Sequence, residues 1–554
     1  MSTVTPIASL ANLLLGRVDN AQRIETEYLH SLAWTWGAYV QDAWKVNSKL
    51  TLNLGLRYDL ESPRYLDNNH QNSFNTKEIN PVSGTPGVVT FAGINGQSKY
   101  ANNFDDALFG PRLGFAYTPL EHWVVRGGGA LLYPGEYDAA TPVTAFTGFS
   151  NSISLQSTNS KAGVPSFILA NNLSEGTGTA AFPTTSELTS GFGAVAVGAK
   201  THLGPQFYRP QRTNGYFYQA NFDIQRELPG NLLLDLGYLG TYGHHLVLAG
   251  TAESINQISP SNAALLRNGT VAPGKASTLR PFPQFTNVQY LGDDVGQSNY
   301  NGINIGVQKR YSHGLQYQAN YTWSKFIDNQ ESRNELAGYP GNDSFIDYYN
   351  PRDRYGYSGN DVRNRIVGNA LYDLPVGRGR LVNIENRYVN SVIGGWTASG
   401  VTEYHSGTAL SPIVGGSNIN GLFADGVRPN LVPGQNPNSV PGGRSRTEWF
   451  NTAAFEFNPS ANPSEEYTFG NAPRTFGRGP SLFNTDATLL KKFSVFEGSA
   501  LEFRVEALNV FNHANLGNPN TTYTPTSTTF GTISGLQSGA TASRVVQLAA
   551  HFTF

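Results

Sequence analysis

The sequence predicts an all-β chain, and three observations support this prediction. Side chains alternate between apolar and polar along many segments of about ten residues, the length that a tilted strand needs to cross a bilayer. Only 14% of the 554 residues are charged, whereas 12% are aromatic and 60 are glycine. Residues 544–554 alternate up to a terminal phenylalanine, Phe554. Together these observations predict an antiparallel transmembrane β-barrel, whose strands place every second side chain in lipid.

The two sets of alternating side chains differ in polarity, and this difference predicts the two faces of the barrel wall. Near the C-terminus, Glu502, Arg504 and Glu506 all fall on one face. Near the N-terminus, Leu54 falls on an apolar face and Asn53 on a polar one. A charged side chain that faces lipid at mid-membrane costs about 2–4 kcal/mol, whereas one that faces the lumen is solvated. We therefore expect the polar faces to line a lumen and the apolar faces to contact lipid.

About thirteen segments carry the alternation and are the expected strands. They are residues 34–46, 49–60, 111–118, 123–133, 211–228, 231–241, 299–310, 315–324, 363–374, 395–405, 484–495, 499–511 and 543–554. Bacterial single-chain barrels have even numbers of strands. Either a further strand lies inside a long connection, or further strands belong on the N-terminal side.

The connections between these segments alternate in length. Short turns are expected near residues 47–48, 118–122, 229–230, 312–314 and 497–498. Long connections, rich in Gly, Asn, Ser, Thr and Pro and expected to lack regular structure, run near 60–110, 134–210, 242–298, 406–480 and 512–542. Short periplasmic turns and long extracellular loops are the arrangement of outer-membrane barrels.

Composition excludes several other classes of protein. The net charge of -2 shows no excess of basic residues that would indicate nucleic-acid binding. The absence of cysteine excludes disulfides and thiolate metal sites. No apolar run reaches the length of a transmembrane helix. Residues 10–15 are apolar but lack a preceding basic residue, so they make a poor secretory signal. Composition alone equally fits a secreted β-sandwich or carbohydrate-binding protein.

Several segments in order resemble TonB-dependent outer-membrane receptors, in the Oar-like barrel subgroup. The first are WGAYVQDAW with the following LTLNLGLRYD, and FGPRLGFAY at residues 109–117. The others are DVRNRIVGNALYDLPVG at 361–377, GGWTASGVTEYHSG at 394–407, FRVEALNVFNH at 503–513, and Phe530 and Gly531 followed by 544–554. The resemblance covers residues 34–554 in patches, while the loops between the patches resemble nothing that we can assign.

The family barrel has 22 strands, so the resemblance implies that this chain holds its C-terminal portion. The first expected strand would then be the family's tenth and would descend, which agrees with its short following turn. Residues 34–554 are expected to be an incomplete Oar-like barrel domain, and residues 1–33 a remnant of an extracellular loop. The resemblance places the signal, TonB box, plug and first nine strands in an N-terminal region that this chain lacks.

The resemblance also implies a location and partners. It places the chain in the outer membrane of a Gram-negative cell, in contact with lipid, with the TonB complex engaged only through that N-terminal region. Phe552 and Phe554 on the last strand resemble the signal that the barrel assembly machinery reads. The ligand classes implied are siderophores, oligosaccharides and peptides, while secretion or surface roles remain open. No cofactor is implied.

Acidic and histidine pairs are weak candidates for metal sites. Asp105 with Asp106, Asp293 with Asp294, and Asp343 with Asp347 lie in expected loops, where calcium finds oxygen ligands. None has EF-hand spacing, so solvated loop tips are the favoured interpretation. His244 and His245 point in opposite directions on a strand. No residue set has spacing that predicts catalysis, and the glycines at 127–129, with no helix after them, indicate close wall packing.

The segment around residues 348–365 carries the candidate ligand residues. In one interpretation, Arg352 and Arg354 belong to an anion-binding patch at the barrel mouth or in the lumen, and the rings of Tyr348, Tyr349, Tyr355 and Tyr357 stack on a sugar or siderophore. The alternative, which the sequence favours, is a structural salt-bridge network together with loop packing. That network would include the charged residues of the same segment, Asp353, Asp361, Arg363 and Arg365.

Three functions follow from these observations. The leading hypothesis is a receptor or transporter barrel that takes up a scarce ligand, without enzymatic activity. The second is a passive porin-like or structural barrel. The third is a secreted all-β carbohydrate-binding protein, which would be soluble without detergent.

Overall fold

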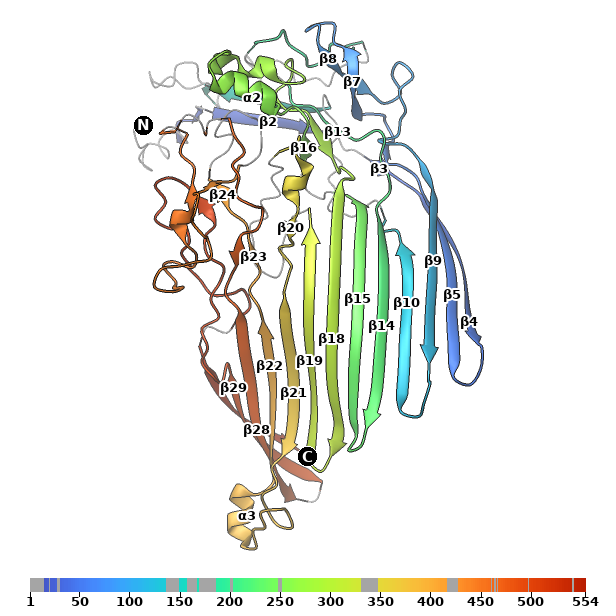
Figure 1. The fold of residues 1–554 in the computed structure, drawn as a ribbon, viewed down its shortest axis with the longest axis vertical. Coiled ribbons are helices and arrows are strands. Elements are labelled where there is room, and N and C mark those ends of the chain that lie inside the picture. Colours follow the sequence, from blue (N-terminus) through green and yellow to red (C-terminus); the bar gives the residue numbers. More distant parts are fainter. Residues whose placement is uncertain are drawn as a thin grey trace.

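One large antiparallel sheet forms the body of the molecule in the computed structural model (Figure 1). The structure describes residues 14–18, 20–26, 30–135, 149–156, 167–168, 186–199, 203–247, 252–329, 347–415, 427–459, 461–462, 465, 467–496, 498–540 and 543–554. Asp343, one of the acidic residues considered above, lies outside these residues. Among the described residues, no helix has the length and apolar character that crossing a membrane requires.

The sheet, called the wall below, contains thirteen strands in chain order among the described residues. They are β4 (Thr35–Lys45), β5 (Leu50–Glu61), β9 (Asp105–Tyr117), β10 (Trp123–Leu132), β14 (Tyr216–Leu228), β15 (Leu232–Leu246), β18 (Gly296–Ser312), β19 (Leu315–Asp328), β21 (Asn364–Asp373), β22 (Trp396–His405), β28 (Leu482–Phe496), β29 (Ser499–Leu508) and β31 (Val545–Thr553). A short strand, β20 (Gly356–Tyr357), also pairs with β19. Each of the thirteen expected strands is confirmed. Within the described residues the wall is open, because β4 and β31 each pair on one side only.

Tight turns join strand pairs at one end of the wall, called the turn end. His313 and Gly314 between β18 and β19 both have positive φ, as do Gly230 and Asn231 between β14 and β15. Two central residues with positive φ make the turn whose twist matches that of the strands it joins. Before β5, the Asn47 side chain accepts hydrogen bonds from the backbone N–H groups of Lys49 and Leu50, at 2.8 and 2.9 Å. The short turns expected near residues 47–48, 118–122, 229–230 and 312–314 are confirmed, whereas residue 497 of the turn expected at 497–498 lies outside the described residues.

The register confirms which side chains share a face. Residues directly opposite each other in an antiparallel pair point to the same side. Leu54 lies opposite Leu113 of β9, and Asn53 lies opposite Gly114. On β29, Glu502 lies opposite Lys492 of β28, and their side chains form an ion pair at 3.3 Å. The wall therefore has one apolar face and one face with paired charges, as the alternation predicts.

The glycines of β10 lie where the wall is closely packed. A Cβ on Gly127 would lie 2.6 Å from the ring of Phe115, and one on Gly128 would lie 2.9 Å from the carbonyl oxygen of Leu113. A larger side chain would displace the ring at the first position or the neighbouring strand at the second. These glycines are packing residues, as their context in the sequence indicates.

The long connections have regular structure, so the expectation that they lack it is wrong. Pairs within and between these connections are β7 (Asn72–Ile79) with β8 (Pro86–Phe91), β13 (Gln206–Tyr208) and β16 (Ala252–Ser254) with β17 (Gln289–Leu291), β23 (Ala409–Leu410) with β27 (Gly477–Arg478), β24 (Ile413–Val414) with β30 (Thr522–Tyr523), and β25 (Asn430–Leu431) with β26 (Phe455–Glu456). Three strands that precede β4 pair with strands of the connections: β1 (Arg17–Val18) with β12 (Phe167–Ile168), β2 (Asn20–Thr26) with β11 (Ser150–Gln156), and β3 (Ser31–Leu32) with β6 (Tyr65–Leu66). The connections also hold α2 (Pro260–Arg267), η3 (Pro273–Leu279), η4 (Pro351–Arg354) and η5 (Thr452–Ala454). Most of these ladders are two or three residues long, too short for a period-two pattern to show.

An aromatic core holds several long connections together above the wall, at the end called the loop end. Phe74 packs its ring against Phe207, Phe282 and Phe285, with ring centroids 5.1 to 5.5 Å apart. These residues come from three different connections, and both Phe207 and Phe285 are fully buried. Burying one such ring contributes about 1.5–3 kcal/mol. The connections at this end are therefore folded onto one another (Figure 1).

Candidate ligand cleft at the loop end of the wall

The segment 347–363 runs from the aromatic core to the start of β21 and holds the expected ligand residues. Tyr348 packs against the aromatic core, and its backbone N–H donates to the side chain of Gln257 at 2.9 Å. The Tyr349 hydroxyl donates to the Gln257 carbonyl at 3.0 Å, and burial raises the pKa of Tyr349. Both tyrosines thus fasten the segment to the loop that precedes α2.

Arg354 is also part of the packing. It is buried, with 6% of its surface exposed, and its carbonyl accepts a hydrogen bond from Arg474 at 2.9 Å. Direct contact of Arg354, Tyr348 and Tyr349 with a ligand stays a prediction, and their positions point to support of the loop fold.

Arg352 and Tyr355 differ from these three, because both line an open cleft of about 950 Å³. The other lining residues come from the connections before β9, β14, β18 and η4, from the adjoining ends of β15 and β18, and from η4 itself. They are Asn103, Arg209, Gln211, Arg212, Thr213, His245, Asp294, Val295, Gln297, Asn329 and Pro351. Arg352 is exposed, while Tyr355 donates its hydroxyl hydrogen to Gln297. Burial raises the pKa of Tyr355, so this hydroxyl keeps its proton at neutral pH.

Asp293 and Asp294 organise one side of the cleft. The expectation that they form a solvated loop tip is wrong, because both are buried. Arg209 donates to Asp293 at 2.8 Å and to Asp294 at 3.1 Å, and the backbone N–H of Thr213 donates to Asp294 at 2.8 Å. Unpaired buried carboxylates would be unstable, and Arg209 stabilises both by pairing with them and fixes the turn between β17 and β18. Among the described residues, no group of three His, Asp or Glu side chains is arranged to hold a metal ion.

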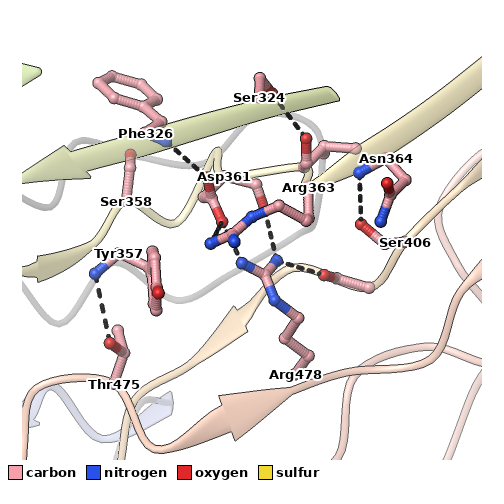
Figure 2. A network of polar contacts seen from close by, with 12 residues as sticks. Ser324, Phe326, Tyr357, Ser358, Asp361, Arg363, Asn364, Ser406, Thr475 and Arg478 are labelled. Atoms are coloured by element: carbon pink, nitrogen blue, oxygen red, sulfur yellow. Dashed lines mark hydrogen bonds and ion pairs between the residues drawn. The ribbon is translucent and has the colours of Figure 1, made fainter. Parts of the chain in front are cut away.

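A second set of arginines fixes the segment that carries Arg352 and Tyr355. Arg428 contacts the Asp353 carboxylate at 2.9 Å, and Arg474 contacts Asp328 at 2.7 Å. Figure 2 shows Arg478 of β27 reaching the buried carboxylate of Asp361, which also accepts from the backbone N–H of Phe326 on β19 at 2.6 Å. We call Arg428, Arg474 and Arg478 the arginine clamp.

The clamp joins the connection between β22 and β28 to the end of β19. The Arg478 guanidinium also donates to the carbonyls of Asp361 and Gly407, at 3.1 and 3.0 Å. A hydrogen bond from Arg363 lowers the pKa of Tyr357, whose ring lies 5.2 Å from the Arg478 guanidinium. Outside the clamp, Arg365 pairs with Glu403 at 2.9 Å. The structural salt-bridge network that the sequence favours is therefore present at Asp353, Asp361, Arg363 and Arg365.

The chemistry of the cleft suits an anion that also offers a flat surface. Three guanidinium groups line it, those of Arg209, Arg212 and Arg352, against the lining carboxylate of Asp294. A guanidinium presents a planar fork of N–H donors that fits carboxylate or phosphate oxygens. Tyr355 adds an aromatic ring whose exposed part is accessible from the cleft.

A curved antiparallel wall with tight turns at one end and folded loops at the other defines the class of outer-membrane β-barrels. A family model described as outer membrane beta barrel domain matches residues 1–547, and the chain belongs to that family. The protein is thus located in an outer membrane, with the turn end periplasmic and the loop end extracellular. A soluble, secreted β-protein is no longer an alternative.

Solved structures with a similar fold are larger than this chain. The outer membrane transporter YddB from Escherichia coli has a TM-score of 0.40 and 9% identity, over 96% of this chain and 54% of its own. The siderophore receptor PiuA from Acinetobacter baumannii has a TM-score of 0.39 and 11% identity, over 94% and 43%. The pyoverdine receptor FpvA from Pseudomonas aeruginosa has a TM-score of 0.38 and 10% identity, over 95% and 43%. The chain spans about half the length of these proteins or less. A comparison with curated proteins finds no match.

Proposed function

We propose that this chain is the barrel of an Oar-like TonB-dependent receptor that takes up a scarce ligand across the outer membrane. The observation that carries the proposal is the extracellular cleft, lined by Arg209, Arg212, Arg352 and Tyr355. A simple pore needs only an unobstructed mouth, whereas here the loops have a core and an arginine clamp that fix the cleft in place. Its function is recognition and transport, with no enzymatic step.

The lining of the cleft narrows the ligand class. Among siderophores, oligosaccharides and peptides, the arginines favour members that carry carboxylate, phosphate or other anionic oxygens. Arg352 is the exposed guanidinium best placed to meet such a ligand, since Arg209 already pairs with Asp293 and Asp294. Tyr355 would stack on a flat part of the ligand.

We further propose that additional N-terminal strands complete the barrel, together with a plug and a TonB box. The support is the open wall, since β4 and β31 each have a single neighbour among the described residues. In lipid, each unpaired backbone N–H or C=O costs several kcal/mol, so both edges need partner strands. Residues 1–33 and 34–554 remain the proposed division into loop and barrel.

Assembly of the barrel would use its last strand. Phe552 follows Leu548 and Ala550 on the apolar face of β31 and lies opposite Leu501 of β29, and Phe554 comes two residues later, just after the end of the strand. Both phenylalanines are exposed at the periplasmic end. They form the proposed signal for the barrel assembly machinery.

The proposal is tested by deleting the gene in its own host and measuring uptake of labelled ferric siderophores, acidic peptides and oligosaccharides. We expect the deletion to abolish uptake of one anionic class, and a protonophore to abolish the same uptake in the wild type. Uptake that the protonophore leaves unchanged would contradict a TonB-dependent mechanism. Steady ion conductance of the purified chain in planar bilayers would favour the passive porin instead.

A further inference from the structure

The connection between β21 and β22 is unlike the tight turns beside it. It spans residues 374–395 and contains the helix α3 (Arg387–Ile393), which lies beyond the periplasmic end of the wall (Figure 1). The sequence pattern does not predict this helix. Asn386 begins it, since its side chain accepts from the backbone N–H groups of Tyr388 and Val389 at 3.0 and 3.1 Å.

The helix exposes an apolar face. Tyr388, Val389, Val392 and Ile393 span an arc of about 140° at 3.6 residues per turn. Their exposed fractions are 80%, 45%, 65% and 47%, and the preceding turn adds Leu381, which is 89% exposed. The polar residues Asn390 and Ser391 fall on the other side of the helix. A contiguous apolar surface of this kind marks a binding site for a partner or a membrane.

The position of α3 indicates which of these covers the apolar face. The Lys491 ammonium donates to the carbonyls of Ser391 and Val392 at 2.6 and 3.2 Å, and the Trp396 indole N–H donates to Val392 at 2.9 Å. Trp396 and Lys491 lie opposite each other, two residues from the pair Ala398 and Leu489 on the apolar face of the wall. The helix is therefore attached to the lipid side of the wall rather than to its lumen side.

The charges around α3 fit a phospholipid surface. Residues 374–395 contain three arginines, Arg378, Arg380 and Arg387, against one acidic residue, Glu385, and all four are exposed. An apolar helix face flanked by arginines is the composition of helices that lie in the interface of anionic membranes. Tryptophan at the same level is typical of the boundary between hydrocarbon and headgroups.

We propose that α3 is an interfacial anchor in the periplasmic leaflet of the outer membrane. Its apolar face enters the acyl boundary, and Arg378, Arg380 and Arg387 contact lipid phosphate groups. Because Lys491 and Trp396 fix the helix to the wall, this short helix need not bind the membrane by itself. The anchor sets the depth of the barrel in the bilayer, independently of any ligand at the extracellular end.

The test uses single cysteines, which are unique labels because the natural chain has none. Val392→Cys places an environment-sensitive fluorophore on the apolar face of α3, and Glu385→Cys is the matched control outside it. Each folded variant is reconstituted in vesicles of phosphatidylethanolamine and phosphatidylglycerol, and the fold is checked by heat-modifiable gel mobility. Quenching is then measured with doxyl-labelled lipid and with aqueous iodide.

We expect doxyl lipid to quench the label at residue 392 at least threefold more than the label at 385, and iodide to show the reverse order. Equal iodide quenching at both positions would overturn the proposal, because the helix would then face water. Protection of residue 392 from both quenchers would also overturn it and indicate a protein partner or a second copy. Val389→Cys on the same face repeats the test if the label at 392 disturbs folding.

Discussion

The wall and the extracellular loops of this protein are stabilised by different kinds of interaction. In the wall, each strand pairs with its neighbours along the chain, and the apolar side chains face lipid rather than one another. In the loops, the aromatic core and the arginine clamp join residues that lie far apart in the sequence. The wall therefore depends on a repeated local pattern, whereas the cleft depends on particular long-range contacts.

The largest expected effect comes from the aromatic core. Phe285→Ala removes a fully buried ring and should destabilise the loop fold by about 3–5 kcal/mol, as large-to-small core substitutions do. Limited proteolysis should then cut residues 252–295 much faster, while heat-modifiable mobility of the wall stays unchanged. The exposed Phe511→Ala serves as the control. Loss of wall assembly in Phe285→Ala would show that the two regions do not fold separately.

The next effect tests the two faces of the wall. Leu54→Arg puts a charge on the apolar face and should block assembly, at a cost of about 2–4 kcal/mol at mid-membrane. Asn53→Arg is the matched control, since it lies next to Leu54 on the polar face. Heat-modifiable gel mobility measures both variants. Similar behaviour of the two would contradict the face assignment.

The arginine clamp should give a smaller effect that is confined to the loops. Asp361→Asn keeps the shape of the side chain but removes the charge that Arg478 meets, a change of about 1.5–3 kcal/mol for hydrogen bonds to charged groups. Protease cleavage within residues 427–478 should rise, and Glu403→Gln, which breaks the pair with Arg365 in the wall, should not raise it. An unchanged cleavage rate in Asp361→Asn would show that the arginine clamp does not stabilise the loops.

The smallest effect is a pH dependence at Tyr357. Arg363 lowers the pKa of this hydroxyl in the folded protein. The unfolded chain then binds more protons, so stability of the loops should rise as pH rises through the folded pKa towards about 10, the unfolded value. Absorbance titration of the wild type against Tyr357→Phe measures the shift. If the difference between the two titrations gives a pKa at or above the ordinary tyrosine value, the predicted lowering of the Tyr357 pKa is wrong.

The difference between local and long-range contacts also determines which elements the sequence predicts. The strands of the wall are visible because alternation is local and each strand is about ten residues long. The loop ladders β23 and β27 pair residues almost seventy positions apart and have two residues each, so no window of sequence reveals them. The sequence does not predict helix α3, because its seven residues are too few to show a helical period.

Two of the ligand candidates indicated by the sequence line the cleft. Arg352 and Tyr355 stood out because charge and aromatic residues are concentrated around them, and both line the cleft. Arg209 and Arg212 lie in the connection before β14 and His245 lies at the end of β15, and only folding brings them to the same place. The pair Asp293 and Asp294 was noticed as acidic, yet its burial against Arg209 depends on a contact more than eighty residues away in sequence.

Whether the cleft is the ligand site is tested most directly by calorimetric titration of the folded chain with the anionic ligand class that the uptake assay identifies. We expect binding to the wild type and affinity about 10- to 100-fold weaker in Arg352→Ala, the loss expected for a charged hydrogen bond of about 1.5–3 kcal/mol. Arg310→Ala, an exposed arginine at the periplasmic end, should bind like the wild type. Equal affinity of Arg352→Ala and the wild type would contradict the assignment of the cleft as the ligand site.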